Sequence, residues 1–538
     1  MAETPILQDT ERLSGRIALK KNIDAGVALA GAVRSTLGPK GLDKMLIDQS
    51  GRILVTNDGI TVLENAKVEH PIAKMLINAS ATQDRVARDG TTSTVLIASE
   101  LLQNSWQLVL QGVHPTIISK GYRKAESIAI SALDEIGVIA DQEQILNTIE
   151  TALDGKISAS SKSHLASLAF QAASQIAQEG KDGLNIDLSK VVSLPRVGGK
   201  NLDSEVVNGL VMNKKPIHSD MPRKLSNGKI LLLAGGIERR KLRQLSTLQI
   251  TTKTGYSDFV EYEYEELKKK VEHVLDLGID VLVVKDNIDD NIHKLLSDNG
   301  IQCFRRVPKE DLELISDTCN ANLVLSVENA SKSDLGEFYS SECTMPGGIN
   351  QWIITGPGKA ATFIVRGSTE TNISEYERCF DDALGVASAM IKDGKILAGG
   401  GASQTYLARK LRRAAMKFPK REQLAVEAYA DALEIIPRVL SENAGLDPID
   451  TLFKLVAAQT EHEAEKQDMN IGLEVHSKNC VNMLDSGYVE PIGVILQSIN
   501  SATESAVSVL RIDDVLWAKV EPDVPDEAQE RLNDLGMV

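Results

Sequence analysis

The sequence is poor in aromatic residues and in positive charge. Phe, Trp and Tyr make up only 4% of it, so most of the flat side chains on which single-stranded nucleic acids stack are missing. The 75 acidic residues outnumber the 59 basic ones, and the net charge of -16 opposes binding to a phosphate backbone or an anionic lipid surface. No stretch approaches the roughly 18 apolar residues that a membrane-spanning helix needs. We therefore expect neither nucleic acid nor a membrane among the partners.

Cysteine is also scarce, and the few cysteines are scattered. They form no CxxC pair, and their odd number predicts reduced thiols rather than a zinc site or a disulfide framework. The five are Cys303, Cys319, Cys343, Cys379 and Cys480. The first residues contain no basic segment followed by an apolar run, which predicts a cytoplasmic protein without a secretory signal.

The common signatures of nucleotide and hydrolase sites are missing as well. The sequence has no G-x-x-x-x-G-K-[ST], which excludes a Walker-type ATPase, and no G-x-G-x-x-G after an apolar strand to suggest a dinucleotide fold. It has neither a G-x-S-x-G nucleophile elbow nor an H-E-x-x-H metal helix. Any catalytic site must therefore be built from less familiar elements.

What is present begins with a helical N-terminal block. A chain of 538 residues predicts three or four folding units. Apolar residues at helical spacing predict a helix over 20–37 that stops at Gly38-Pro39. Asn57-Asp58-Gly59 lies between two β-branched runs, a pattern typical of a tight hairpin turn. Two long apolar helices are expected over about 63–83 and 91–111.

The middle of the chain changes character. Short continuous apolar runs at 229–233, 280–284 and 322–325 alternate with charged helical patterns near 261–278 and 290–299. Continuous apolar strands alternating with helices predict a buried parallel sheet in an α/β domain. Residues 242–268 show little amphipathic order and predict an extension from that domain.

Helical patterns return at about 374–391 and dominate the C-terminal third, apart from a turn-rich segment near 470–490. The two ends of the chain thus look alike and the middle looks different. This similarity predicts that the ends pack together as one discontinuous domain with the α/β unit inserted between them.

The segment Asp89-Gly90-Thr91-Thr92-Ser93 is the first candidate for chemistry. A glycine followed by hydroxyl residues at a helix start exposes backbone N–H groups at the positive end of the helix dipole, where a phosphate binds well. In that setting the hard carboxylate oxygens of Asp89 are suited to Mg²⁺. The alternative is an ordinary helix cap, in which Asp89 accepts N–H bonds from the next turn.

Four other positions have a structural and a functional interpretation. Asp58 and Asp393 lie in Asn-Asp-Gly and Lys-Asp-Gly turn signals, and local sequence alone makes both simple turn residues. Lys156 is either a contact for a terminal phosphate or a solvated lysine. The run Gly399–Gly401 allows a sugar to approach the backbone closely, or forms a hinge.

Six segments together carry a resemblance to a known family. They occur in order along the chain at Leu37–Leu46, Asn57–Gly59, Asp89–Thr92, Gly112–Pro115, Gly399–Ala402 and Arg511–Asp514. One such match is weak evidence, but six in order are strong. The sequence resembles the group II chaperonins, the family of the archaeal thermosome and the eukaryotic cytosolic chaperonin, along essentially its whole length.

The resemblance implies a multidomain fold with three parts. A mainly α-helical, discontinuous equatorial domain that binds ATP would comprise 1–143 and 400–538. A mixed α/β intermediate domain would comprise 144–211 and 365–399. An α/β apical domain that binds clients would comprise 212–364, with a helical lid protrusion at about 242–268.

The resemblance also implies roles for individual residues. Asp393 would orient and deprotonate the attacking water with help from Asp58, Lys156 would sense the γ-phosphate, and Asp89 would hold Mg²⁺. The ATP or ADP phosphates would be bound by Gly38, Pro39, Gly90, Thr91, Thr92 and Ser93. Gly400 and Glu490 would hold the ribose, and Leu37, Gly59 and Gly472 would belong to the same nucleotide site.

By resemblance, the chain would be an ATP hydrolase whose identical or paralogous subunits form two stacked rings that enclose non-native client proteins. One departure affects this expectation: Arg88 replaces the first glycine of the Gly-Asp-Gly-Thr-Thr pattern typical of the family. A side chain there would strain the loop if the backbone needs a positive φ. Two alternatives therefore stay open, a chaperonin-like scaffold or holdase with weak hydrolysis and a metabolic phosphotransferase.

Overall fold

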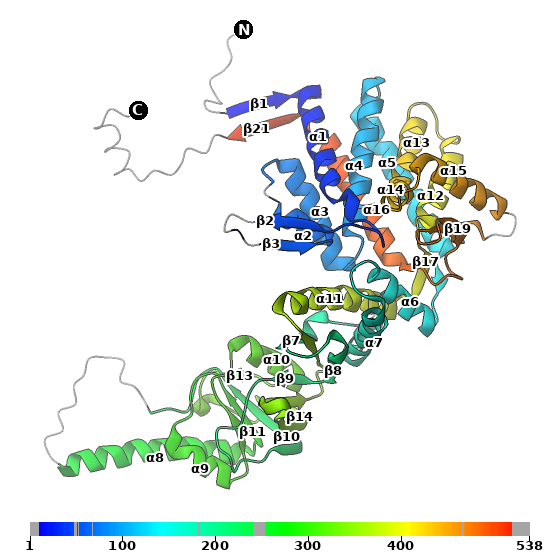
Figure 1. Cartoon of the computed structure of the whole chain (residues 1–538). Helices are drawn as coiled ribbons and strands as arrows, with labels where there is room; N and C mark the ends of the chain where they lie inside the picture. The colour runs from blue at the N-terminus through cyan, green and yellow to red at the C-terminus, as the bar shows by residue number, and fades with distance from the viewer. Residues whose placement is uncertain are drawn as a thin grey trace, which may run out of the picture. The chain divides into compact units, whose positions relative to one another are not determined.

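The computed structural model describes residues 10–47, 51, 53–66, 68–180, 183–239, 253–463 and 467–518 (Figure 1). The chain forms two compact units. Met1–Lys156 and Gly394–Val538 make up unit 1, and Ile157–Asp393 make up unit 2. Among the described residues, no helix combines the length and the apolar character that crossing a membrane requires.

Unit 1 is built from helices contributed by both ends of the chain. They are α1 (Gly15–Val33), α2 (Gly59–Asn65), α3 (Pro71–Ala87), α4 (Thr91–Leu110), α5 (Pro115–Ile136), α6 (Gln142–Ala152), α12 (Ala402–Ala415), α13 (Glu422–Leu433), α14 (Ile435–Asn443), α15 (Pro448–Glu461) and α16 (Ile492–Leu510). Its short strands are β1 (Thr10–Ser14), β2 (Lys44–Ile47), β3 (Ile53–Thr56), β4 (Val138–Ile139), β17 (Lys395–Ala398), β18 (Ile471–Glu474), β19 (Asn479–Asn482), β20 (Val489–Pro491) and β21 (Asp514–Ala518).

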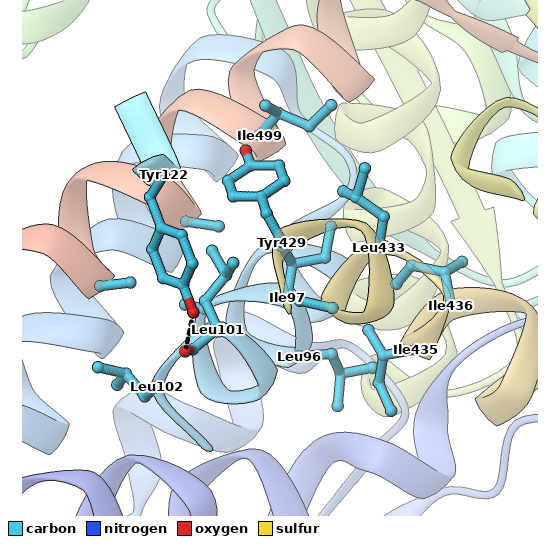
Figure 2. Close-up of a cluster of buried hydrophobic side chains, with 14 of the residues drawn as sticks. Leu96, Ile97, Leu101, Leu102, Tyr122, Tyr429, Leu433, Ile435, Ile436 and Ile499 are labelled. Atoms are coloured by element: carbon cyan, nitrogen blue, oxygen red, sulfur yellow. Dashed lines mark hydrogen bonds between the residues drawn. The ribbon is translucent and has the colours of Figure 1, made fainter. Parts of the chain in front are cut away.

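The core of unit 1 joins helices that are far apart in the sequence. Tyr122 of α5 and Tyr429 of α13 meet edge to face, with ring centroids 5.6 Å apart. Each buried hydroxyl has a partner, because Tyr122 donates to the carbonyl of Leu101 at 2.8 Å (Figure 2) and Tyr429 lies 2.6 Å from the hydroxyl of Thr503. A buried hydroxyl without a partner would cost about 1–3 kcal/mol. These pairs therefore fix how α4, α5, α13 and α16 pack.

The ends of the described chain also pair directly. Strand β1 lies antiparallel to β21, with Thr10 opposite Ala518 (Figure 1). Strand β17 pairs with both β4 and β20. This sheet is a second place where strands from the two ends of the chain form hydrogen bonds with each other. Unit 1 is therefore discontinuous in sequence.

Unit 2 contains a seven-stranded sheet of mixed direction. Its order is β12-β11-β10-β14-β15-β9, with β13 also paired to β10. The strands are β9 (Leu210–Met212), β10 (Lys224–Leu233), β11 (Val281–Val284), β12 (Gln302–Phe304), β13 (Leu323–Val324), β14 (Gly336–Thr344) and β15 (Gln351–Thr355). The parallel half, β10 to β13, matches the predicted α/β pattern. The sheet as a whole is mixed, because β14, β15 and β9 add antiparallel strands to the predicted parallel ones.

The remaining elements of unit 2 are two small sheets and five helices of the described chain. A second sheet has the order β7-β16-β8, formed by β7 (Val191–Val197), β8 (Glu205–Asn208) and β16 (Ala361–Gly367), and β5 (Gln178–Gly180) pairs with β6 (Gly183–Asn185). The helices are α7 (Ala159–Ile176), α8 (Lys253–Leu277), α9 (Asp290–Asp298), α10 (Lys309–Cys319) and α11 (Glu370–Asp393). Residues 253–268 of the predicted extension belong to α8, whereas 242–252 lie outside the described residues.

Two local predictions for the N-terminal block are wrong. Asn57-Asp58-Gly59 is not a hairpin turn: the antiparallel pair is β2–β3, and Asp58 is the N-cap of α2. The expected single helix over 63–83 is divided, because α2 ends at Asn65 and α3 begins at Pro71. The residue before a proline is pushed out of helical conformation, so His70 begins a new helix instead of continuing the old one.

Candidate functional site

A pocket in unit 1 collects most of the residues predicted for the site. It is lined by the predicted residues Leu37, Gly38, Pro39, Asp58, Gly59, Asp89, Gly90, Thr91, Thr92, Ser93, Lys156, Gly400 and Glu490. These residues come from separate segments at both ends of the chain. The structure therefore brings together side chains and loops that no single motif connects.

One wall of the pocket is the start of α4. Gly90 has a left-handed backbone with φ of +77°, and a Cβ there would lie 2.9 Å from Cγ1 of Val494. The N–H of Gly90 donates to Oδ1 of Asp89 at 2.7 Å, but no side chain in the described structure caps the N–H groups of the first turn of α4. Those groups and the positive end of the helix dipole therefore face the pocket region, which suits an anion.

A second wall combines the start of α2 with the turn after α6. Oδ2 of Asp58 accepts hydrogen bonds from the N–H of Thr61 at 3.2 Å and from its hydroxyl at 2.6 Å. Asn57 donates to the carbonyl of Gly155 at 3.2 Å, next to Lys156. The carboxylate of Asp58 and the ammonium group of Lys156 therefore belong to the same pocket wall.

The loop Leu37–Pro39 forms the third wall and is held by α14. The side-chain amide of Asn443 donates to the carbonyl of Leu37 at 2.8 Å. The guanidinium group of Arg34 makes two hydrogen bonds to Glu442, at 2.8 and 2.7 Å. A bidentate pair of this kind fixes orientation as well as distance, so the loop is tied to the C-terminal helices.

The other end of the pocket is formed by backbone around Gly400. The φ of Gly400 is +62°, and a Cβ at this position would lie 2.6 Å from the carbonyl oxygen of Leu473. Only glycine fits so close an approach. Glu490 lies in β20 opposite Leu397 and lines the pocket. Gly472 does not line the pocket, but a Cβ there would lie 2.5 Å from the carbonyl oxygen of Gly399.

Asp393, like Gly472, is a predicted site residue that is not among those lining this pocket. It is the last residue of α11 and belongs to unit 2. The Lys-Asp-Gly segment thus marks the boundary between the two units. Its predicted role in catalysis stays a prediction.

Two carboxyl groups at the site have raised pKa values. Burial, reinforced by the negative charge of Asp89, raises the pKa of Glu490 to about 7. Burial also raises the pKa of Asp84, although the positive charge of Arg88 opposes that shift. The negative charge of Asp58 also raises the pKa of Asp84, and the positive charge of Lys156 lowers it. Asp84 therefore interacts electrostatically with two residues that line the pocket.

Arg88 adopts the left-handed conformation that the typical glycine would take easily. Its φ is +54° and its ψ is 9°, and it caps the C-terminus of α3. Its guanidinium group lies 3.8 Å from Oδ2 of Asp84, one turn earlier on α3. Arg88 is not among the residues that line the pocket. Arg88 therefore has the positive φ that the resemblance led us to consider. Its positive charge lies next to the carboxylate of Asp84.

No motif in the sequence pointed to the apolar wall of the pocket. Its members include Ile97, Ile436, Leu440, Leu473, Val475, Met483 and Val494. Such residues are indistinguishable from ordinary core positions in the sequence. Gln404 and Asp154 also line the pocket and belong to no motif.

The residues fit a magnesium ion that arrives with a nucleotide. Within the described residues, His, Cys, Asp and Glu side chains form no group of three or more that could hold a metal ion unaided. Mg²⁺ typically binds through one or two carboxylates together with substrate phosphates and water. Asp89, which lines the pocket just before the N-terminus of α4, would supply the carboxylate in that arrangement.

The fold and the pocket define a multidomain α/β protein whose helical unit contains a pocket suited to an anion. Residues 29–520 match the TCP-1/cpn60 chaperonin family. A thermosome subunit from Pyrococcus horikoshii is 39% identical over 526 residues, covering 96% of this chain and 95% of that protein. A thermosome alpha subunit from Archaeoglobus fulgidus is 39% identical over 524 residues, with 96% and 95% covered.

A solved structure agrees with these sequence comparisons. The open-state monomer of a group II chaperonin from Methanococcoides burtonii matches with a TM-score of 0.64 and 33% identity, covering 79% of this chain and all of that one. The chain belongs to the TCP-1/cpn60 chaperonin family and, within it, to the group II chaperonins. All five cysteines are free in this structure.

Proposed function

We propose that this chain is a chaperonin subunit that hydrolyses ATP to ADP and phosphate and uses the energy to fold non-native proteins. Membership of a chaperonin family implies ATP-dependent protein folding. The observation that carries the proposal is the pocket of unit 1, where two aspartates, a lysine and the uncapped start of α4 surround one space.

The proposed mechanism assigns work to each wall of the pocket. The N–H groups of Gly90–Ser93 and the loop Leu37–Pro39 bind the phosphates, and Lys156 neutralises charge that develops on the terminal one. Gly59 and Thr92 pack closely, since a Cβ on Gly59 would lie 2.3 Å from Oγ1 of Thr92. Phosphoryl transfer depends mainly on such positioning and charge neutralisation.

Asp89 would hold Mg²⁺, which when bound neutralises phosphate charge. Asp393 accepts the proton of the attacking water, and Asp58, fixed by Thr61, assists in orienting that water. Gly400 and Glu490 hold the ribose, with Gly472 supporting the backbone beside Gly400. Asp393 lies at the boundary of unit 2, so the proposal requires that residue to reach the bound nucleotide during the cycle.

The proposal includes three domains and a ring. Residues 1–143 and 400–538 would act as the equatorial domain, 144–211 and 365–399 as the intermediate domain, and 212–364 as the apical domain. The thermosome relatives are named as subunits, two of them alpha and beta, which supports assembly with identical or paralogous subunits into two stacked rings. Clients would be non-native proteins, and the cytoplasmic location stays a prediction.

The test is ATP hydrolysis by the size-fractionated protein, with electron microscopy of the same fraction. Because a positioned general base contributes about 10²-fold or more to a rate, Asp393→Ala is expected to reduce kcat by at least that factor. Asp381→Ala is the matched control, since Asp381 is an exposed aspartate on the same helix α11. Double rings whose turnover survives Asp393→Ala would refute the mechanism.

The weak-hydrolysis alternative depends on Arg88. The contact of its guanidinium group with Asp84, together with its absence from the pocket lining, gives that alternative no support from geometry. Arg88→Gly distinguishes the proposed ATP hydrolase from the weak-hydrolysis alternative, because only the alternative predicts a several-fold rise in ATP turnover.

A further inference from the structure

Behind the phosphate-binding loop lies a glutamine that is fully buried. Gln83 of α3 has no exposed surface. Its side-chain nitrogen donates to the carbonyl of Asp89 at 2.8 Å and to the carbonyl of Val494 at 3.2 Å. Gln83 therefore ties the loop between α3 and α4 to the first turn of α16.

This amide is expensive to bury. Its oxygen Oε1 is buried and has no hydrogen-bond partner in the part of the chain that the structure describes. An unsatisfied buried acceptor is destabilising, because the hydrogen bond that it made to water in the unfolded chain is not replaced. Leucine or methionine would fill a similar volume without that cost, so packing alone does not account for a glutamine here.

The loop is also tightly fitted against Gln83. A Cβ on Gly90 would lie 3.1 Å from the side-chain nitrogen of Gln83. A second polar contact fixes the same loop, because the hydroxyl of Thr94 lies 3.0 Å from the carbonyl of Gly90 and 3.0 Å from the hydroxyl of Ser498. The bonds from Gln83 and Thr94 both end on backbone carbonyls. Neither bond uses the N–H groups of the first turn of α4 or the carboxylate of Asp89.

We infer that Gln83 is a positioning residue of the nucleotide site, which holds the backbone of Asp89 and Gly90 so that the loop presents its carboxylate and N–H groups to the phosphates. This inference rests on the proposed function for the identity of the ligand. It assigns Gln83 no contact with the nucleotide, and Gln83 is not among the residues that line the pocket.

The chain contains a matched control. Gln459 of α15 is also fully buried, and its side-chain nitrogen bridges the carbonyls of Ala402 at 3.0 Å and Ile471 at 2.9 Å. It supports the other end of the pocket, around Gly400 and β18. The two glutamines thus make the same kind of bridge behind opposite ends of one site.

The test compares the binding of ADP and of adenosine by calorimetry, with Mg²⁺ and with a chelator, in the full-length protein. Losing the bridge is expected to weaken ADP binding by Gln83→Met about ten-fold or more. Adenosine, which has no phosphate, should bind Gln83→Met as it binds the wild type. Gln459→Met should instead weaken the binding of both ligands by a similar factor.

Gln83→Glu provides a second variant of nearly identical shape. Its second carboxyl oxygen would face two carbonyl oxygens, so the same selective loss of ADP affinity is expected. Unchanged ADP affinity in either folded Gln83 variant, or an equal loss of ADP and adenosine, overturns the inference. A wild type that binds ADP but does not hydrolyse ATP contradicts the proposed function and leaves the assignment of Gln83 intact.

Discussion

Glu490 and Asp89 line the same pocket, and the negative charge of Asp89 adds to the effect of burial in raising the pKa of Glu490 to about 7. The two residues come from opposite ends of the sequence. Burial first, and the neighbouring charge second, make Glu490 sensitive to pH near 7.

This relationship predicts a pH dependence of stability. The folded pKa of Glu490 is about 7 and its ordinary value is 4.5, so the folded protein binds more protons than the unfolded chain between these values. The contribution of Glu490 to the free energy of unfolding is therefore present at low pH and lost as pH rises towards 7. In Glu490→Gln this slope should disappear. The measurement is the melting temperature of nucleotide-free protein from pH 5 to pH 8, and parallel curves for both proteins would contradict the prediction.

Arg88→Gly should stabilise the protein. A non-glycine residue in the left-handed region carries a strain of about 1–3 kcal/mol, part of which is offset by the greater flexibility of glycine in the unfolded chain. We expect a net gain of about 1 kcal/mol in urea unfolding. Lys420→Gly is the control, since Lys420 has a φ of +63°. Both variants should gain stability, and neither should change ATP turnover. A several-fold rise in turnover for Arg88→Gly alone would favour the weak-hydrolysis alternative.

The buried ion pair between α12 and the segment before β18 should contribute strongly to the stability of unit 1. Arg409 lies 3.2 Å from Asp468, and both are almost fully buried. Removing one partner leaves an uncompensated buried charge, so Arg409→Met should cost about 3–5 kcal/mol in the free energy of unfolding.

The control for Arg409→Met is Lys20→Met. Lys20 pairs with Asp24 at 2.5 Å, and the two side chains are 45% and 56% exposed. Exposed pairs contribute only about 0–1 kcal/mol. Urea denaturation of unit 1 measures both, and equal losses would show that burial does not decide the outcome.

Part of this site was predictable from the sequence because local chemistry determines it. A glycine followed by three hydroxyl residues forms an open helix start whatever surrounds it, and α4 begins at Thr91 as expected. The helix that ends before Gly38 followed from spacing and punctuation in the same way. The resemblance supplied the rest of the residue set, most of which lines one pocket.

Other features depend on distant contacts and could not be predicted. Asp58 has the sequence context of a hairpin turn, yet Thr61 makes it a helix cap. The apolar wall around Met483 and Leu473 has no local signature, because the same residues serve any core. Gln83 is equally invisible, since its partner Val494 lies 411 positions away.

The central claim is that ATP hydrolysis drives protein folding by this chain. The most direct measurement is the refolding yield of a chemically denatured client protein, with phosphate release followed in the same sample, for wild type and Asp393→Ala. We predict that ATP raises the yield with wild type and that Asp393→Ala still binds the client but neither releases phosphate nor refolds it. A yield that does not depend on ATP, or one that Asp393→Ala fully retains, would contradict the account.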